Sequence, residues 1–232
     1  MLRPTYFLLM AFLAAPAFAA SPDYFNGWKL IDQANGDLNR DGIDDVVLVT
    51  EETNPVNFKE KNPELLGPEI LNLNPRRLSI LLNSPNGPKE ILSRDDLLPS
   101  QNEENTTCLA DPLENGGISI VKGNLVIELQ EWLSCGSYGV VHETFTFRLQ
   151  GTRFRLIGYD RSESSRSTGE RSEFSTNYLT GKKKITTGLN DFEDYKAKVS
   201  WKRFPAMRAF FLDEIFLSCD ADNSAQKDSW CR

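Results

Sequence analysis

Oxygen-bearing side chains recur at alternate positions in one short segment of the chain, beginning at Asp37. Gly42 follows them, at the place where a calcium-binding loop turns sharply. A hard cation such as Ca²⁺ is bound by roughly 6–8 oxygen atoms, and short acidic side chains in a tight loop can supply most of them. We therefore expect one structural Ca²⁺ ion, with the side chains of Asp37, Asn39, Asp41 and Asp45 and the backbone carbonyl of Ile43 as its ligands.

The alternative is a metal-free turn, because Asp and Asn favour turns on their own account. The loop carries four carboxylates and only Arg40 to balance them, so without an ion they would repel one another. This imbalance favours the calcium interpretation. Asp44 is out of phase with the alternating ligands, and we expect its side chain to be solvated.

The loop matches the EF-hand consensus only in part, because the twelfth residue counted from Asp37 is Leu48 and not Glu. The pattern Asp-x-Asn-x-Asp-Gly-x-x-Asp followed by Val46–Val49 resembles the FG-GAP type of repeat. That family is known from integrin-like propellers and many bacterial secreted proteins. The resemblance covers about residues 28–52 in a single copy, and it implies a calcium loop between two strands.

The elements that would hold this loop have the hydrophobic pattern of strands. The segment 45–50 contains a continuous apolar run, Val46–Val49, typical of a buried strand, and residues 144–149 alternate strictly between apolar and polar. About ten such segments follow one another in hairpin order. We expect a mainly β fold of antiparallel meander sheets, packed either as a sandwich or as blade-like units. We place one sub-unit at about 24–98 and a second sheet at about 108–190, with a surface loop at 51–77 and either a loop or a frayed strand tip at 161–171.

The C-terminal part, about residues 191–232, changes character. Pro205 precedes apolar residues spaced i, i+3, i+4 and i+8, which predicts a short amphipathic helix that buries Met207, Phe210, Phe211 and Ile215.

The N-terminus has the composition of a secretory signal peptide. Arg3 precedes a short apolar stretch from Tyr6 to Phe18, and Ala17-Phe18-Ala19 forms a small-x-small cleavage site. The apolar stretch is shorter than the roughly 20 residues that span a bilayer, and no other segment is longer. We expect residues 1–19 to be removed, leaving one mainly β domain, 20–232, without a transmembrane segment. Residues 154–182 resemble a group of uncharacterised bacterial periplasmic proteins, which implies a periplasmic or secreted location.

All four cysteines lie in the predicted mature chain, where an oxidising compartment would pair them. Three pairings are open, and we favour Cys108–Cys135 and Cys219–Cys231 because each pair is nearest in sequence. A catalytic Cys135 with His142 as its base is the alternative, but this single His has no obvious orienting partner.

The composition and the residue pattern exclude some classes of function. A net charge of −7 argues against a nucleic-acid binder. The pattern shows no positioned nucleophile or base, so we favour a non-catalytic binding module for an unknown envelope or extracellular protein or glycan. The alternative is a hydrolase of cell-wall or extracellular polymer with structural calcium. A cleft of titratable groups with perturbed pKa values would favour the hydrolase.

Overall fold

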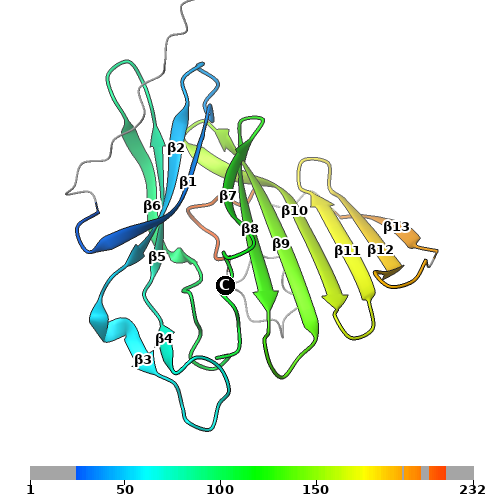
Figure 1. The fold of residues 1–232 in the computed structure, drawn as a ribbon. Coiled ribbons are helices and arrows are strands. Elements are labelled where there is room, and N and C mark those ends of the chain that lie inside the picture. The colour runs from blue at the N-terminus through cyan, green and yellow to red at the C-terminus, as the bar shows by residue number, and fades with distance from the viewer. Residues whose placement is uncertain (1–24, 195, 205–208, 218–232) are drawn as a thin grey trace, which may run out of the picture.

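The computed structural model describes residues 25–194, 196–204 and 209–217, and these residues form mainly antiparallel β-sheets (Figure 1). Strands follow the chain order across both large sheets, as the meander prediction requires, except that β3 and β4 form a separate two-stranded sheet between β2 and β5. The predicted fold class is therefore confirmed. No helix in the described ranges is long and apolar enough to cross a membrane.

The smaller of the two large sheets has the strand order β1-β2-β5-β6. Its central strand β2 is buried along almost its whole length, as its apolar run predicts. In the register of the sheet, Val47 lies opposite Ala34 on one side and Ile80 on the other. The strands are β1 (Trp28–Gly36), β2 (Asp45–Glu52), β5 (Arg76–Leu82) and β6 (Lys89–Leu98).

The segment 51–77 is more ordered than the surface loop that we expected. It contains a short 3-10 turn, η2 (Pro55–Asn57), and a two-stranded sheet of β3 (Phe58–Glu60) and β4 (Ile70–Asn72). Asn and Pro favour turns, but here Asn54 caps η2 by accepting a hydrogen bond from the Val56 N–H. The turn-forming residues of segment 51–77 thus separate short regular elements, which include a β-hairpin.

The larger sheet has seven strands in the order β13-β12-β11-β10-β9-β8-β7. Of the two expectations for 161–171, the structure supports the strand tip, because β10 runs to Ser165 and β11 starts at Glu170. The backbones pair there despite the Ser-rich and charged sequence, for example Arg161 opposite Phe174, and the Arg161 side chain donates to the buried carboxylate of Glu143 at 2.8 Å. The strands are β7 (Gly117–Val121), β8 (Asn124–Trp132), β9 (Gly139–Gln150), β10 (Arg153–Ser165), β11 (Glu170–Asn177), β12 (Lys182–Asn190) and β13 (Lys198–Arg203).

The two large sheets share one hydrophobic core. Buried residues of the four-stranded sheet and of β8 to β10 belong to the same cluster, among them Val49, Leu78, Ile127 and Phe147. The sheets therefore pack face to face in this region, whereas β11, β12 and β13 fan away from the four-stranded sheet (Figure 1).

A close backbone approach joins the sheets where β1 meets β7. Asp32 accepts a hydrogen bond of 2.8 Å from the Ile118 N–H. A Cβ atom at Gly117 would lie 2.4 Å from the Asp32 carboxylate, and the φ of Gly117 is +106°. Only glycine satisfies both conditions without strain.

The predicted C-terminal helix does not form over the described residues 209–217, which we call the closing strap. The strap is extended at its start. It pairs with the N-terminal part of β10, on the side where β11 pairs only from Gly158 onward. There Leu156 N–H donates to the Phe210 carbonyl at 2.9 Å, and Leu212 N–H donates to the Phe154 carbonyl at 2.8 Å. Alternate burial of Phe210 and Leu212, followed by a turn, produced the apolar spacing that we interpreted as helical. Residues 205–208, including Met207, lie outside the described ranges.

The disulfide Cys108–Cys135 is confirmed, with Cα atoms 5.6 Å apart. It links the segment before β7 to the residues after β8. The predicted Cys219–Cys231 pair and the predicted signal peptide both lie outside the described residues.

Candidate functional site

The predicted metal loop connects β1 to β2, and its backbone curls around the carboxylate of Asp37. Asp37 Oδ1 accepts hydrogen bonds from the backbone N–H groups of Arg40, at 2.5 Å, and Asp41, at 3.1 Å. Asp37 Oδ2 accepts one from Gly42 at 2.9 Å. Gly42 has a φ of +86°, which explains the glycine at the sharp turn. The first residue of the pattern therefore organises the whole loop.

Asn39 and Asp41 lie close to each other in the same loop. The Asn39 side chain donates to Asp41 Oδ2 and accepts from the Asp41 N–H, both at 2.9 Å. Asp41 Oδ1 also accepts from the Ile43 N–H at 2.9 Å. Hydrogen bonds thus connect Asp37 to Asp41 and Asn39 to Asp41.

Asp45 is buried at the base of the loop and has a second partner segment. Its Oδ2 accepts from the Leu38 N–H at 2.8 Å, and its Oδ1 accepts from the Asn83 N–H at 2.9 Å. Burial raises the pKa of the Asp45 carboxyl above its usual value, although the bonds from Asn83 and Leu38 act in the opposite direction. Asp45 therefore connects the β1–β2 loop to the turn between β5 and β6.

The donor chemistry of the loop fits a hard cation. Every predicted ligand atom is an oxygen, and none of Asp37, Asp41, Asp44 and Asp45 forms an ion pair with a described Lys or Arg. A carboxylate oxygen that accepts an N–H still has lone-pair capacity for a metal. In the described ranges, however, no three His, Cys, Asp or Glu side chains form a group that could hold a metal ion by themselves. The predicted set therefore depends on the Asn39 amide and the Ile43 carbonyl as well.

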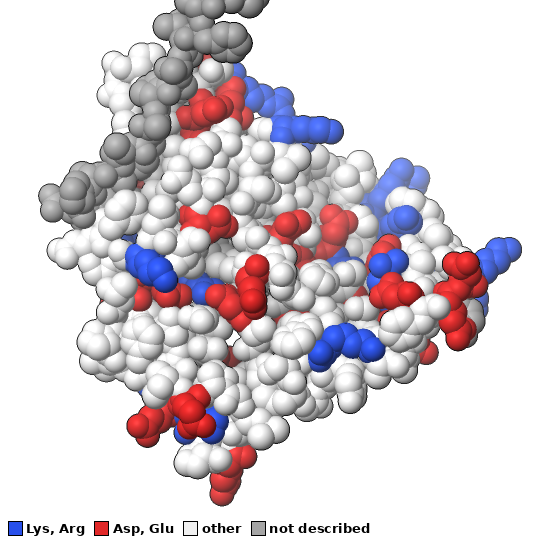
Figure 2. Space-filling model, viewed as in Figure 1, with Lys and Arg blue, Asp and Glu red and all other residues white. Residues whose placement is uncertain are grey.

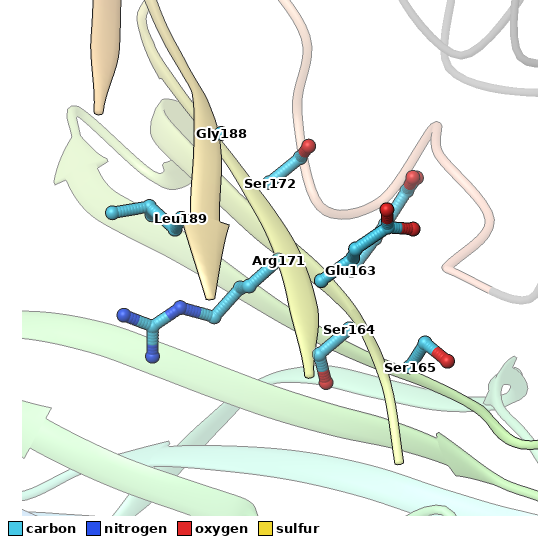
Figure 3. Close-up of a pocket in the computed structure, with 8 residues that line it drawn as sticks. Glu163, Ser164, Ser165, Arg171, Ser172, Gly188 and Leu189 are labelled. Atoms are coloured by element: carbon cyan, nitrogen blue, oxygen red, sulfur yellow. The ribbon is translucent and has the colours of Figure 1, made fainter. Parts of the chain in front are cut away.

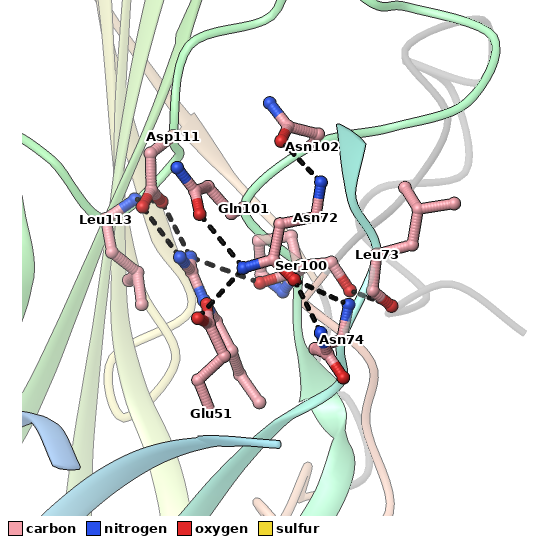
Figure 4. A network of polar contacts seen from close by, with 11 residues as sticks. Glu51, Asn72, Leu73, Asn74, Ser100, Gln101, Asn102, Asp111 and Leu113 are labelled. Atoms are coloured by element: carbon pink, nitrogen blue, oxygen red, sulfur yellow. Dashed lines mark hydrogen bonds and ion pairs between the residues drawn. The ribbon is translucent and has the colours of Figure 1, made fainter. Parts of the chain in front are cut away.

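A second polar centre, which the sequence did not reveal, is built around Arg76 (Figure 4). Arg76 opens β5 and is 2% exposed. Its guanidinium donates two hydrogen bonds of 2.6 Å to Asp111 and one of 3.0 Å to Glu51. Burial alone would lower the pKa of Arg76, but the bonds and charges of Asp111 and Glu51 raise it above its usual value.

Amide side chains extend this centre into the loops (Figure 4). Asn72 donates to Glu51 at 2.9 Å and to Gln101 at 3.0 Å, and Asn74 donates to Asn72 at 2.8 Å. The Asn102 side chain accepts from the Asn72 N–H at 2.9 Å. The network therefore joins the excursion after β2 to the loop that leads to β7.

A groove of about 420 Å³ lies over the Arg76 centre, between β1 and this loop. Carboxylates also gather across the middle of the face seen in Figure 2. Three groove carboxylates already accept hydrogen bonds from the protein: Asp32 from Ile118 N–H, Glu51 from Asn72 and Arg76, and Asp111 from Arg76. These three carboxylates stabilise the fold through their hydrogen bonds. They do not form a pair of free carboxylates that could act as general acid and general base.

A shallower hollow of about 350 Å³ lies where β10, β11 and β12 end (Figure 3). Arg171 and Leu189 extend to one side of these strands, while Glu163 and Ser172 extend to the other. Arg171 forms ion pairs with Asp191 at 3.3 Å and with Glu173 at 3.6 Å. The basic group of this hollow is therefore balanced by neighbouring acids.

The thiol alternative fails at Cys135, because its sulfur is bonded to Cys108 and cannot act as a thiolate nucleophile.

No protein-family model, no curated protein and no solved structure matches this chain. The resemblance of residues 28–52 to the FG-GAP repeat therefore stays a prediction. The functional conclusion depends on the chemistry of the residues described above.

Proposed function

We propose that this protein is an exported, calcium-binding β protein that acts as a non-catalytic binding module in the periplasm or outside the cell. Its partner would be an envelope or extracellular protein or glycan. One observation carries the proposal: the loop 37–45 holds four carboxylates without an ion pair to a described cation. A bound Ca²⁺ ion would supply the missing positive charge.

The position of the loop supports a structural role for the ion. Asp37 and Asp45 are each bonded to backbone N–H groups, and Asp45 reaches the β5–β6 turn through Asn83. Calcium at this point would hold together three strands of the four-stranded sheet. The ion would stabilise the fold and would take no part in a reaction.

A non-catalytic role is supported by the groove over Arg76. Of the four carboxylates that line it, Asp32, Glu51 and Asp111 accept hydrogen bonds from groups of the protein, so the geometry of these three serves the fold. Export is supported by the disulfide Cys108–Cys135, since such bonds persist mainly in oxidising compartments.

The proposal is tested by melting the mature chain, 20–232, with calcium and with a chelator. A ligand at about a hundred times its Kd adds about 2.7 kcal/mol to the free energy of unfolding. For a chain of this length that raises Tm by about 5–10 °C. Asp41→Ala should abolish the shift, whereas Asp44→Ala, a change of equal charge at an exposed neighbour, should keep it. Equal melting temperatures with and without calcium would overturn the proposed metal site.

Export is tested separately by sequencing the N-terminus of the protein recovered from the periplasm or medium. Cleavage after Ala19 predicts Ala20 as the first residue. Recovery of the chain in the cytoplasm, with its N-terminus uncut, would contradict this part of the proposal.

A further inference from the structure

The seven-stranded sheet ends in an open edge at β13. One side of β13 pairs with β12, from Lys182 opposite Arg203 to Thr187 opposite Lys198. The other side has no partner strand in the described part of the chain. All six residues of β13 are exposed. A row of unpaired backbone N–H and C=O groups of this kind can pair with another strand.

Positive charge is concentrated at this edge. Residues 182–203 contain seven Lys and Arg against three Asp and Glu, while the remainder of the chain contains nineteen against thirty. Among the described residues, no acidic group forms an ion pair with Lys182, Lys184, Lys196, Lys198, Lys202 or Arg203. Within the described residues, the edge is therefore a basic surface whose Lys198 and Lys202 form no ion pair, on an otherwise acidic protein.

The two faces of β13 carry different chemistry, because side chains alternate along a strand. Val199 and Trp201 share one face, and they are 53% and 66% exposed. Lys198, Ser200 and Lys202 lie on the other face. An added strand would therefore find an apolar and aromatic strip on one side and two ammonium groups on the other.

Lysine on an edge strand also serves to prevent unwanted pairing. That role alone does not account for an exposed Trp201 and Val199 on the same strand. Pairing of β13 with a second copy of itself would bring Lys198 and Lys202 against like charges, which destabilises cross-strand pairs. The charge pattern thus disfavours self-association and favours an acidic occupant.

We propose that β13 binds an extended acidic segment of a partner protein as an eighth strand of the sheet. Backbone hydrogen bonds would provide affinity, and the alternating side chains would provide specificity. The segment would place Asp or Glu beside Lys198 and Lys202 and apolar side chains beside Val199 and Trp201. This names a partner class for the binding role proposed above, and it does not require the loop 37–45 to hold calcium.

The test measures fluorescence anisotropy of a labelled peptide of about eight alternating Glu and Val residues, titrated with the full mature chain. Saturable binding that weakens with added salt is expected, and a Lys–Val peptide should not bind. Two further Glu–Val peptides carry N-methyl groups on the odd or on the even residues. Strand addition predicts that one of these two loses binding, because alternate residues face β13.

Equal binding of both methylated peptides would overturn strand addition and leave charge attraction alone. Dextran sulfate that competes as well as the parent peptide, with the same sensitivity to variants, would instead indicate a polyanion site and would also overturn the proposal. A calcium-dependent melting shift without peptide binding would leave the proposed metal site standing, so the two failures are distinguishable.

Variants locate the surface. Lys198→Glu with Lys202→Glu should weaken binding at least about tenfold through like-charge repulsion. Lys89→Glu with Lys122→Glu changes the net charge equally at exposed sites elsewhere, and should leave binding unchanged. Trp201→Ala should weaken binding by about fivefold through lost apolar contact. All these side chains are exposed, so unchanged melting temperatures will show that the variants fold. Equal binding by the β13 and the control variants would refute the location.

Discussion

Arg76 and Asp111 face each other through two parallel hydrogen bonds of 2.6 Å, although 35 residues separate them in the sequence. This paired geometry is the strongest that a guanidinium and a carboxylate form. It holds the start of β5 against the loop that leads to β7. The contact therefore couples the two large sheets at the end of the core nearest the groove.

Arg76→Met should destabilise the protein by about 3–5 kcal/mol, because Glu51 and Asp111 would lose their shared cation. Urea unfolding at pH 7 measures the change. Arg77→Met is the matched control. Arg77 is partly exposed, and its ion pair with Asp95 is long, at 3.7 Å, so we expect a loss of about 1 kcal/mol or less. Adding Glu51→Gln and Asp111→Asn to Arg76→Met should restore part of the stability. No recovery in the triple variant would show that the loss arises from packing.

Asp45 predicts a pH dependence of the calcium-free protein. Burial raises the pKa of this carboxyl in the folded state above 3.8, its value in the unfolded chain. Between these two values the folded protein keeps a proton that the unfolded chain has lost, so the contribution to stability falls as pH rises through the folded pKa. In chelator, Asp45→Asn should remove this slope from a series of urea melts between about pH 3 and pH 7. The same variant should bind calcium more weakly than the parent protein. If the pH slope in chelator persists in Asp45→Asn, the slope arises from another titrating group.

Tyr159 predicts a response at alkaline pH. Its hydroxyl donates to the buried carboxylate of Glu143. Burial first, and the Glu143 charge second, raise the pKa of Tyr159 well above its ordinary value of 10.0. The stability that this group provides is complete below that ordinary value and is lost as pH rises beyond it. Tyr159→Phe should cost about 1–3 kcal/mol at neutral pH, measured by urea unfolding, because Glu143 loses a buried donor. The variant should also flatten the alkaline fall in stability, and an unchanged alkaline limb would contradict this assignment.

The disulfide predicts a large redox dependence. Cys108 and Cys135 close a loop with a sequence separation of 27, for which chain entropy gives about 3–4 kcal/mol. The double variant Cys108→Ser, Cys135→Ser should lower the free energy of unfolding, measured by urea denaturation, by that amount. Dithiothreitol added to this variant can reduce only a disulfide between the two remaining cysteines, so any further change in stability reports on that bond. A further drop would support the predicted Cys219–Cys231 pair, and no drop would count against it.

A substitution at Phe210 tests whether the closing strap contributes to the stability of the shared core. The ring is 4% exposed and belongs to the shared core, so Phe210→Ala should cost about 3–5 kcal/mol. Phe192→Ala removes the same side chain at a position that is 65% exposed, and should change stability by less than about 0.5 kcal/mol. Thermal unfolding of the two variants compares them directly. Similar losses would show that the strap does not close the core.

Local patterns in the sequence predicted the local structure well. The apolar run from Val46 to Val49 is a buried strand, and the alternation around Phe145 and Phe147 places both rings in the core. The sequence also predicts a loop that begins at Asp37 between two strands, because its alternating oxygen-bearing side chains and its glycine lie within a few residues of one another.

Features that depend on distant contacts were missed. In β13 only Val199 and Trp201 alternate with polar residues, and neither face of the strand is buried, so its short pattern is hard to distinguish from a loop. The closing strap was assigned to a helix because two buried alternate residues and a turn gave the same spacing. The Arg76 centre depends on partners in three segments, and nothing in the sequence near Arg76 indicates them.

The closing strap also sets the order in which the chain can finish folding. Arg94 of β6 donates to the carbonyls of Leu212 and Ile215, 118 and 121 residues further along, while Phe154 and Leu156 of β10 bond to the same strap. The apolar layer between the sheets thus stays uncovered until these late residues are available. During synthesis from the N-terminus, this apolar layer can therefore be covered only after residues 209–217 have left the ribosome.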